Sequence, residues 1–367
     1  MTAPHSRRAT RGREVALVTC AQLPDADADT QRLIGLLAAL GVRAQAVVWD
    51  DPTVDWAAFD LAVVRSCWDY GTRRAEFLEW ANRVPCLTNP AAVLAWNTDK
   101  RYLAQLDALG VNVVATTWVL PDDGWILPDP VSGSTDWVIK PAVSLAALDT
   151  GRYDVSDHTH RRLAADHVRR LQRAGRVVMV QPYMAGVDVE GETSLVFFGG
   201  RFSHAMRKGA LLDGPDRGID RRFAPNGGLD LTHRAPSAAQ LELAHRALAG
   251  VPGGRERLLY ARVDLVPDAN GHPRVIEVEL TEPQLYLAHV PGAAERFASV
   301  IAARASCRSP AAPFDEMIEV GQGGSRAHGA RRAIDPGFKH PVTSATAGGT
   351  NDGREDDLRR GGRGAAA

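Results

Sequence analysis

The sequence predicts an α/β protein in which a parallel sheet is followed by two α+β units. Strand-like and helix-like segments alternate from Glu14 onward, which is typical of βαβ units. Further along, Gly199 and Gly200 separate two apolar runs and indicate an antiparallel hairpin. Among the 367 residues, 45% are hydrophobic and 24% are charged, which are values typical of a globular protein with a core.

The chain divides by composition into five expected segments. These are a disordered arm at 1–13, folded units at 14–90, 91–183 and 184–305, and a disordered tail at 306–367 that is rich in Gly, Arg, Pro, Ser and Thr. In the first unit, apolar periodicity predicts strands at Val15–Thr19, Ala44–Trp49 and Leu61–Arg65 and helices at Thr30–Leu40 and Arg73–Val84.

The same signals place elements in the second and third units. Helices are expected at Asp99–Leu109, His158–Ala174, Ala238–Leu248 and Pro291–Ala305. Strands are expected at Trp137–Pro141, Val177–Gln181, Thr193–Phe198, Phe202–Arg207, Leu258–Val266 and Arg274–Leu280. Turn residues at 268–271 join the last two strands into a hairpin.

Charge and cysteine usage exclude several classes of function. The net charge of −1 argues against a nucleic-acid partner for the whole chain. The four cysteines form no C-x-x-C pair, so neither a zinc site nor a disulfide framework is expected, and reduced thiols favour a cytoplasmic protein. The longest apolar stretch, near 33–42, is too short to span a membrane.

Lysine is scarce in this chain. Only Lys100, Lys140, Lys208 and Lys339 occur among 43 cationic residues, and a biased genome accounts for the excess of arginine. Where arginine is the default, a retained lysine is a candidate for a site that needs a compact ammonium. Lys100 begins a predicted helix and Lys140 ends a predicted strand, positions that suit phosphate oxygens, although snorkelling surface lysines are the alternative.

The strongest group of charged residues lies on the last two strands. Alternation puts Arg262 and Asp264 on one face of a strand, and Glu277 and Glu279 on one face of the next. If the strands pair, three carboxylates and a guanidinium crowd together and require cations. Hard oxygen ligands beside an arginine indicate a magnesium–phosphate site, and a solvated sheet face is the alternative.

These segments in this order resemble the ATP-grasp superfamily. Glu277–Pro283 is similar to the metal-binding segment of bacterial glutathione synthetase. Other segments resemble short bacterial ATP-grasp ligases, including the O-ureido-serine cyclo-ligase group of cycloserine biosynthesis; they are Val180–Tyr183, Gly191–Phe198, Ser203–Gly209 and Tyr260–Leu265. The resemblance covers residues 14–305. It implies an N-terminal domain before two lobes that clasp ATP, the first lobe ending at Tyr183.

The resemblance also implies site residues. The nucleotide would be bound by Lys100 and Lys140 at the phosphates, by Gln181, Pro182 and Tyr183 as the hinge beside adenine, and by Asp188 or Glu190 at the ribose. Two Mg²⁺ ions, for which Mn²⁺ could substitute, would be held by Asp264, Glu277 and Glu279. Arg262 would neutralise the transferred phosphate, Arg207 would meet an acyl-phosphate or carboxylate, and Lys208 would either assist at the substrate or face solvent.

Two features depart from the family pattern. Glu279 stands where the second metal segment usually ends in Asn, which adds a negative charge to the site. The loop after Lys140 carries glycine only at its end, Gly151, whereas the family's loop is glycine-rich. Fewer glycines predict a stiffer lid with fewer left-handed backbone conformations.

The expected function is ATP-dependent ligation of a carboxylate to an amine, or an intramolecular cyclisation, on a small amino-acid-like substrate. The first unit would supply Arg65 for a carboxylate, Trp68 for packing and Asp69 for an amine, with ordinary aromatic packing as the alternative for Trp68. Peptide or protein modification, nucleotide binding without catalysis, and a kinase that stops at phosphoryl transfer remain alternatives. No nucleic-acid or membrane partner is expected, and a homodimer is left open.

Overall fold

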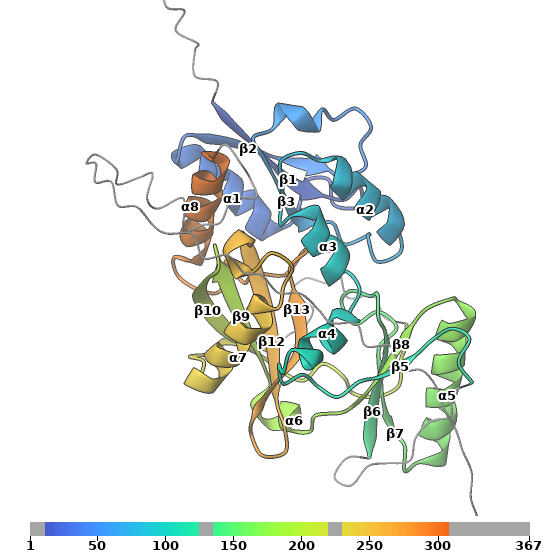
Figure 1. Cartoon of the computed structure of the whole chain (residues 1–367). Helices are drawn as coiled ribbons and strands as arrows, with labels where there is room; N and C mark the ends of the chain where they lie inside the picture. Colours follow the sequence, from blue (N-terminus) through green and yellow to red (C-terminus); the bar gives the residue numbers. More distant parts are fainter. Residues whose placement is uncertain (1–11, 125–134, 219–229, 308–367) are drawn as a thin grey trace, which may run out of the picture. The chain divides into compact units, whose positions relative to one another are not determined.

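The computed structural model describes residues 12–124, 135–218 and 230–307. The predicted arm, except for its last two residues, and the predicted tail beyond Cys307 lie outside these ranges. The described elements form three sheets with helices packed on them (Figure 1).

The N-terminal sheet is parallel, as the sequence predicts, with strand order β2-β1-β3-β4. Its elements are β1 (Arg13–Thr19), α1 (Ala28–Ala39), β2 (Val42–Val48), a 3-10 turn (Trp56–Ala58), β3 (Leu61–Ser66), α2 (Arg74–Arg83) and β4 (Leu87–Thr88). Asp27 begins α1 by accepting a hydrogen bond from the amide of Thr30 at 3.0 Å. Arg65 lies near the carboxyl end of β3, at one edge of this sheet.

The central sheet is antiparallel and has the order β5-β8-β6-β7. Two short helices precede it, α3 (Ala91–Asn97) and α4 (Tyr102–Ala108), and its elements are β5 (Thr117–Val119), β6 (Asp136–Pro141), β7 (Gly151–Asp154), α5 (His158–Arg173) and β8 (Val178–Pro182). Val168 and Leu171 of α5 pack into a cluster with Ile139 and Val178. This packing covers one face of the sheet with a basic helix. Lys140 lies near the end of β6.

The third sheet is also antiparallel, with the order β11-β10-β9-β12-β13. Its elements are α6 (Gly186–Glu190), β9 (Glu192–Phe198), β10 (Arg201–Lys208), β11 (Leu231–His233), α7 (Ala238–Ala249), a 3-10 turn (Arg255–Arg257), β12 (Tyr260–Pro267), β13 (Pro273–Glu279) and α8 (Ala293–Ala305). Gly271 has φ +78°, a left-handed conformation that the β12–β13 turn requires.

The hydrophobic cores cross the segment boundaries that composition predicts. Tyr102 and Leu106 of α4 pack with Phe197 and Leu243 of the third sheet and its helix α7. Phe297 of α8 joins a cluster with residues of β1 and α1. The sequence marks three units by their strands, but helices from one segment complete the core of another.

Candidate active site

The β12–β13 hairpin forms with the register that brings its charged residues together. Arg262 lies opposite Glu279, and Asp264 lies opposite Glu277. Directly opposite residues on paired strands project from the same face. Arg262 is 6% and Asp264 2% exposed, so the alternative of a solvated sheet face is wrong.

Each acid in this cluster is paired with a cation. Arg262 donates to Asp264 through Nε to Oδ1 at 2.9 Å and through Nη2 to Oδ2 at 2.8 Å, and Nη2 also contacts Glu279. Lys100 Nζ lies 3.1 Å from Glu277 Oε1. The bidentate Arg262–Asp264 pair and the Lys100–Glu277 pair offset the free-energy cost of burying these charges.

The pKa values of the acids reflect how well each is compensated. Burial raises the pKa of Asp264, but Arg262 and Lys208 outweigh it and the net shift is downward. For Glu277 the raising effect of burial is outweighed by Lys100 and Lys140, so its pKa is lowered. Burial raises the pKa of Glu279 to about 7 against the opposing charge of Arg262. Positive charge is therefore short at the Glu279 end.

Lys140 differs from the other lysines of the site. It is 8% exposed, and within the described ranges no ion pair involves it. Burial lowers its pKa to about 8, although Glu277 acts in the opposite direction. An unpaired ammonium of this kind is suited to an incoming anion.

Lys208 pairs with Glu192, an acid that was not among the predicted site residues. Lys208 Nζ lies 2.5 Å from Glu192 Oε2 and 3.9 Å from Asp264 Oδ2, so Lys208 does not face solvent. The two residues are directly opposite on β9 and β10. Alternation along β9 could have found Glu192, because Ser194 is next on the same face and lies opposite Asp264.

The predicted adenine hinge is part of the β6–β8 ladder. Gln181 Nε2 donates to Thr116 Oγ1 at 2.8 Å, and Pro182 lies opposite Trp137 on β6. The amide of Tyr183 donates to the carbonyl of Asp136 at 2.8 Å. That amide is therefore occupied within the sheet, and the hinge role beside adenine stays a prediction.

The two ribose candidates lie on and around α6. Asp188 is exposed and accepts hydrogen bonds from Tyr183 and Arg152, whose guanidinium lies 3.6 Å from the centre of the Tyr183 ring. Glu190 is also exposed. Asp188 alone of the two thus shares hydrogen bonds with the predicted hinge, and the ribose role stays a prediction.

Arg207 does not join the cluster. Neighbouring residues on a strand project from opposite faces, and Lys208 projects toward Asp264. Arg207 instead donates to the Glu190 carbonyl at 2.9 Å and to Asp230 Oδ2 at 2.6 Å. The expected contact with an acyl-phosphate at this cluster is not supported, because side-chain alternation along β10 places Arg207 on the opposite face of the sheet.

The three substrate candidates of the first unit have different surroundings. Arg65 is 3% exposed, and its Nε and Nη1 have no hydrogen-bond partner among the described residues. Trp68 is half-buried. The oxygens of Asp69 accept from Trp49 Nε1 at 3.0 Å and Arg73 Nη1 at 3.3 Å. Asp69 therefore holds its own domain together, which argues against its expected role with an amine.

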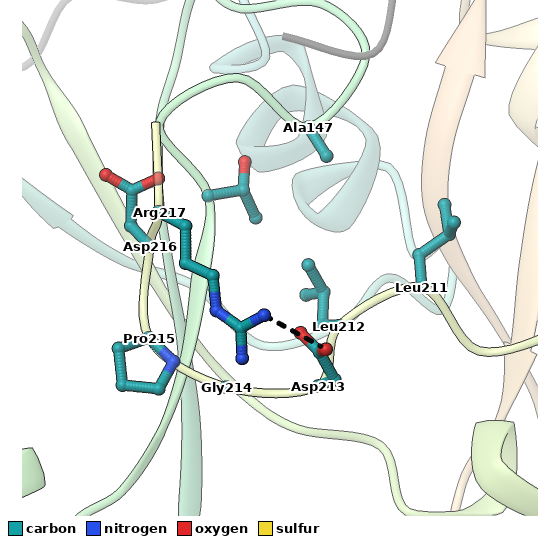
Figure 2. A pocket seen from close by; sticks show the side chains of 9 residues that line it. Ala147, Leu211, Leu212, Asp213, Gly214, Pro215, Asp216 and Arg217 are labelled. Carbon is teal, nitrogen blue, oxygen red and sulfur yellow. Dashed lines mark ion pairs between the residues drawn. The ribbon is translucent and has the colours of Figure 1, made fainter. Parts of the chain in front are cut away.

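The loop after Lys140 adopts left-handed conformations without glycine. Ala146, Ala147 and Asp149 have φ values of 48°, 58° and 56°. The expectation that few glycines would limit such conformations is wrong here, because contacts hold the loop in place. Arg170 Nη1 lies 2.8 Å from Asp149 Oδ1, and Arg176 also pairs with Asp149. Figure 2 shows Ala147 of this loop across a small hollow from residues 211–217.

The carboxylates of the hairpin fit a hard divalent cation by their chemistry. Asp264, Glu277 and Glu279 supply oxygen donors from adjacent positions, and burial together with the neighbouring acids raises the pKa of Glu279. Within the described residues no three acidic, His or Cys side chains converge as a metal site. Lys100 and Arg262 occupy the acids in this arrangement, so a bound ion would share oxygens with them.

Comparison with known proteins places the chain in a family. The family model described as "D-cycloserine synthetase DcsG, N-terminal domain" matches residues 15–91. The cycloserine biosynthesis protein DcsG of Streptomyces lavendulae is 38% identical over 302 residues, which cover 79% of this chain and 98% of that protein. The chain belongs to the DcsG family.

Solved structures agree with this assignment. The crystal structure of D-cycloserine synthetase DcsG matches with a TM-score of 0.69 and 36% identity, covering 80% of this chain and all of that one (100%). The ATP-grasp ligase PsnB, solved with a minimal precursor, Mg and ADP, matches with a TM-score of 0.52 and 16% identity over 78% of this chain and 97% of PsnB. The latter likeness shows the fold alone.

The DcsG family assignment confirms the ATP-grasp fold and the class of enzyme. The chain is an ATP-dependent carboxylate–amine ligase. In the described part of the chain, no helix combines the length and apolar character needed to cross a bilayer.

Proposed function

We propose that this protein uses ATP to activate the carboxylate of a small amino-acid-like substrate and joins it to an amine. The observation that carries the proposal is the set of cations at the hairpin. Arg262 of β12 and Lys208 of β10 pair with acids of the third sheet, as does Lys100, which precedes α4, while Lys140 of β6 has no ion pair among the described residues. The cations that a bound polyanion needs are therefore already in place.

The first step is attack of the carboxylate on the γ-phosphorus of ATP. Both partners are anions, so cations must offset their repulsion. Lys100 and Lys140 would bind phosphate oxygens, and Arg262 would face the transferring group. Asp264, Glu277 and Glu279 would hold two Mg²⁺ ions, or Mn²⁺, which supply further positive charge when bound.

The second step forms the C–N bond. The amine nitrogen attacks the acyl carbon, the acyl C–O bond to phosphate breaks, and a proton leaves the nitrogen. Phosphate and ADP are the other products. Water would hydrolyse the acyl-phosphate, so the loop after Lys140 would exclude it; the ion pairs of Asp149 with Arg170 and Arg176 hold that loop.

The substrate class rests on the relatives. The protein that is 38% identical is named for cycloserine biosynthesis, which supports a small substrate in secondary metabolism and a ring-closing, intramolecular C–N bond. The peptide-modifying alternative has support only from the fold likeness to PsnB, which was solved with its precursor. Cys20, Cys67 and Cys86 are buried free thiols, which supports action in the cytoplasm.

The test is ATP turnover with candidate substrates. Wild-type protein with ATP and Mg²⁺ is incubated with amino acids and their side-chain carbamoyl or ureido derivatives, and ADP, phosphate and the organic product are quantified. We expect one ADP and one phosphate per C–N bond. A stable phosphorylated product would indicate a kinase, and a mass increase on an added peptide would favour the peptide-modifying alternative.

A further inference from the structure

The segment that follows β13 meets the end of β3 at one hydroxyl. Tyr260 Oη lies 2.9 Å from the carbonyl oxygen of Val64 and 2.7 Å from that of Thr281. Arg65 follows Val64 in the sequence, and Glu282 follows Thr281. Both residues therefore follow a carbonyl that is bonded to the same hydroxyl, although they lie 217 positions apart in the sequence.

Arg65 is charged, buried and incompletely paired at this junction. Its Nη2 donates to the Pro283 carbonyl at a long 3.4 Å, while Nε and Nη1 have no hydrogen-bond partner in the described part of the chain. Its guanidinium carbon lies 5.6 Å from the centres of the Tyr260 and Phe297 rings. Unsatisfied buried donors are costly, and their presence in a folded protein points to a ligand that completes them.

The charge of Arg65 acts on two acids, Asp27 and Asp29. Asp27 accepts a hydrogen bond from Ser66, and Asp29 accepts one from the amide of Leu287.

Glu282 is a further acid at this junction, and its side chain has an open acceptor. Its Oε2 is buried without a hydrogen-bond partner, and none of the described cations forms an ion pair with it. It interacts electrostatically with Cys67 and Tyr70 of the first domain and with Glu279 of the hairpin. Glu282 therefore lies between the first domain and the phosphoryl-transfer cluster.

The neighbouring acids are already engaged. Asp69 accepts from Trp49 and Arg73, and Glu279 is paired with Arg262. Arg262 Nη1 also donates to the carbonyl of Gln284 at 3.1 Å. The two arginines thus contact successive carbonyls of one short segment, which links the junction to the cluster.

We propose that Glu282 binds the ammonium group of the substrate and that Arg65 binds its carboxylate through Nε and Nη1. This pair would make the junction the site that selects an amino acid over an acid without nitrogen. The inference rests on the proposed function and adds the residue that recognises the amine. Because Arg65 is only 3% exposed, binding requires the 281–284 segment to shift, and the long bond to Pro283 is the contact exchanged.

The charge state of Glu282 supports this role. Burial raises its pKa well above the ordinary value, and Glu279 raises it further. Lys100 and Arg262 act in the opposite direction. An ammonium beside the carboxyl would lower its pKa and favour the ionised form. A buried Arg65–Glu282 pair completed by a zwitterion leaves no net charge unpaired.

The experiment compares wild type, Glu282→Gln, Glu282→Asp and the control Glu242→Gln, whose side chain is exposed on α7. The probes are the L and D forms of alanine and serine, with lactate and glycerate as the matching 2-hydroxy acids. Affinity is measured by calorimetry in the presence of ADP and Mg²⁺. KM values for the amino acid and for ATP are measured by ADP release, and melting temperatures report folding.

We expect wild type to bind at least one amino acid 30-fold or more tightly than its hydroxy acid. Glu282→Gln should raise the Kd and KM for that amino acid at least 30-fold, with the KM for ATP within threefold and an unchanged or higher melting temperature, because no hydrogen bond is lost. Glu282→Asp should recover part of the affinity, and Glu242→Gln should match wild type.

Three results would overturn the inference. The first is an amino-acid Kd that stays within threefold in Glu282→Gln, the second is equal binding of amino and hydroxy acids by wild type, and the third is no binding of either by wild type. Failure of the proposed function gives a different result. In that case wild type forms no C–N product, while amino-acid binding and its dependence on Glu282 persist.

Discussion

Two regions of this protein treat buried charge in opposite ways. On the face of β12 and β13, Arg262, Asp264, Glu277 and Glu279 are paired with one another or with lysines at short distances. At the junction of β3 with the segment after β13, the buried Arg65 and the half-buried Glu282 each have buried atoms without a hydrogen-bond partner among the described residues.

The difference separates two kinds of preorganisation. Paired charges keep the empty hairpin stable, and they must exchange partners when phosphates and metal bind. Unpaired charges leave the empty junction less stable, and a ligand supplies what is missing. Lys140, buried and without a described ion pair, belongs to the second kind although it lies beside the hairpin.

The largest expected effect comes from removing charge at the phosphate and metal site. Lys140→Met and Glu277→Gln should each lower the rate of ADP release by about 10²–10³-fold, because charge aimed at the transition state is lost. Circular dichroism verifies folding, and Glu242→Gln serves as the control. Full turnover by both variants would refute the assignment of this site.

Next in size is the effect on stability of breaking a paired charge. Arg262→Met removes the bidentate partner of the buried Asp264 and a partner of the half-buried Glu279, and should lower the free energy of unfolding by about 3–5 kcal/mol. Arg207→Met, on the other face of the same sheet, loses a contact to the exposed Asp230 and should cost at most about 1 kcal/mol. Urea denaturation measures both, and equal losses would remove the distinction between the two faces.

A smaller effect concerns pH. Phosphate binds the ammonium form of Lys140, whose pKa is lowered to about 8 by burial, so nucleotide affinity should hold below pH 8 and weaken above it. Between pH 7 and 9 the Kd should rise about tenfold, as the charged fraction falls. Calorimetric titration with a non-hydrolysable ATP analogue measures this. Lys140→Met should bind weakly with a flat profile, and a steep profile in that variant would assign the titration elsewhere.

The smallest effect is expected at Asp69. Its oxygens are held by Trp49 and Arg73, so Asp69→Asn should lower the melting temperature slightly and leave the KM for the amino acid within twofold. The matched comparison is Glu282→Gln, which should change KM but not stability. A large KM change in Asp69→Asn would restore Asp69 as the amine ligand.

Local patterns in the sequence predict most of the fold. The long strands and helices, such as Glu192–Phe198 and His158–Arg173, lie within one or two residues of their expected limits because each has a clear apolar period. Short elements such as β4, β5 and α6 escape prediction, since two to five residues carry too little periodicity. The pairing of Arg262 and Asp264 with the Glu277 strand was predictable, because hairpin register follows from a short turn.

Other site residues depend on contacts that no local pattern contains. The parity of β10 relative to its neighbours decides that Lys208 joins the cluster and Arg207 does not. The side chain of Asp69 is engaged by Trp49, 20 residues earlier. The position of Glu282 depends on Tyr260, whose hydroxyl contacts Val64 of β3 and Thr281.

The sequence by itself determined the order of strands and helices, the charged hairpin and the lysines that face it, since these follow from spacing along one chain. Tertiary structure alone decided which charges are paired and which are left open. Burial and partner distance set the cost of a charge, and both depend on residues far apart in the sequence. For this protein, Arg65 and Glu282 acquire their meaning only where β3 meets the segment after β13.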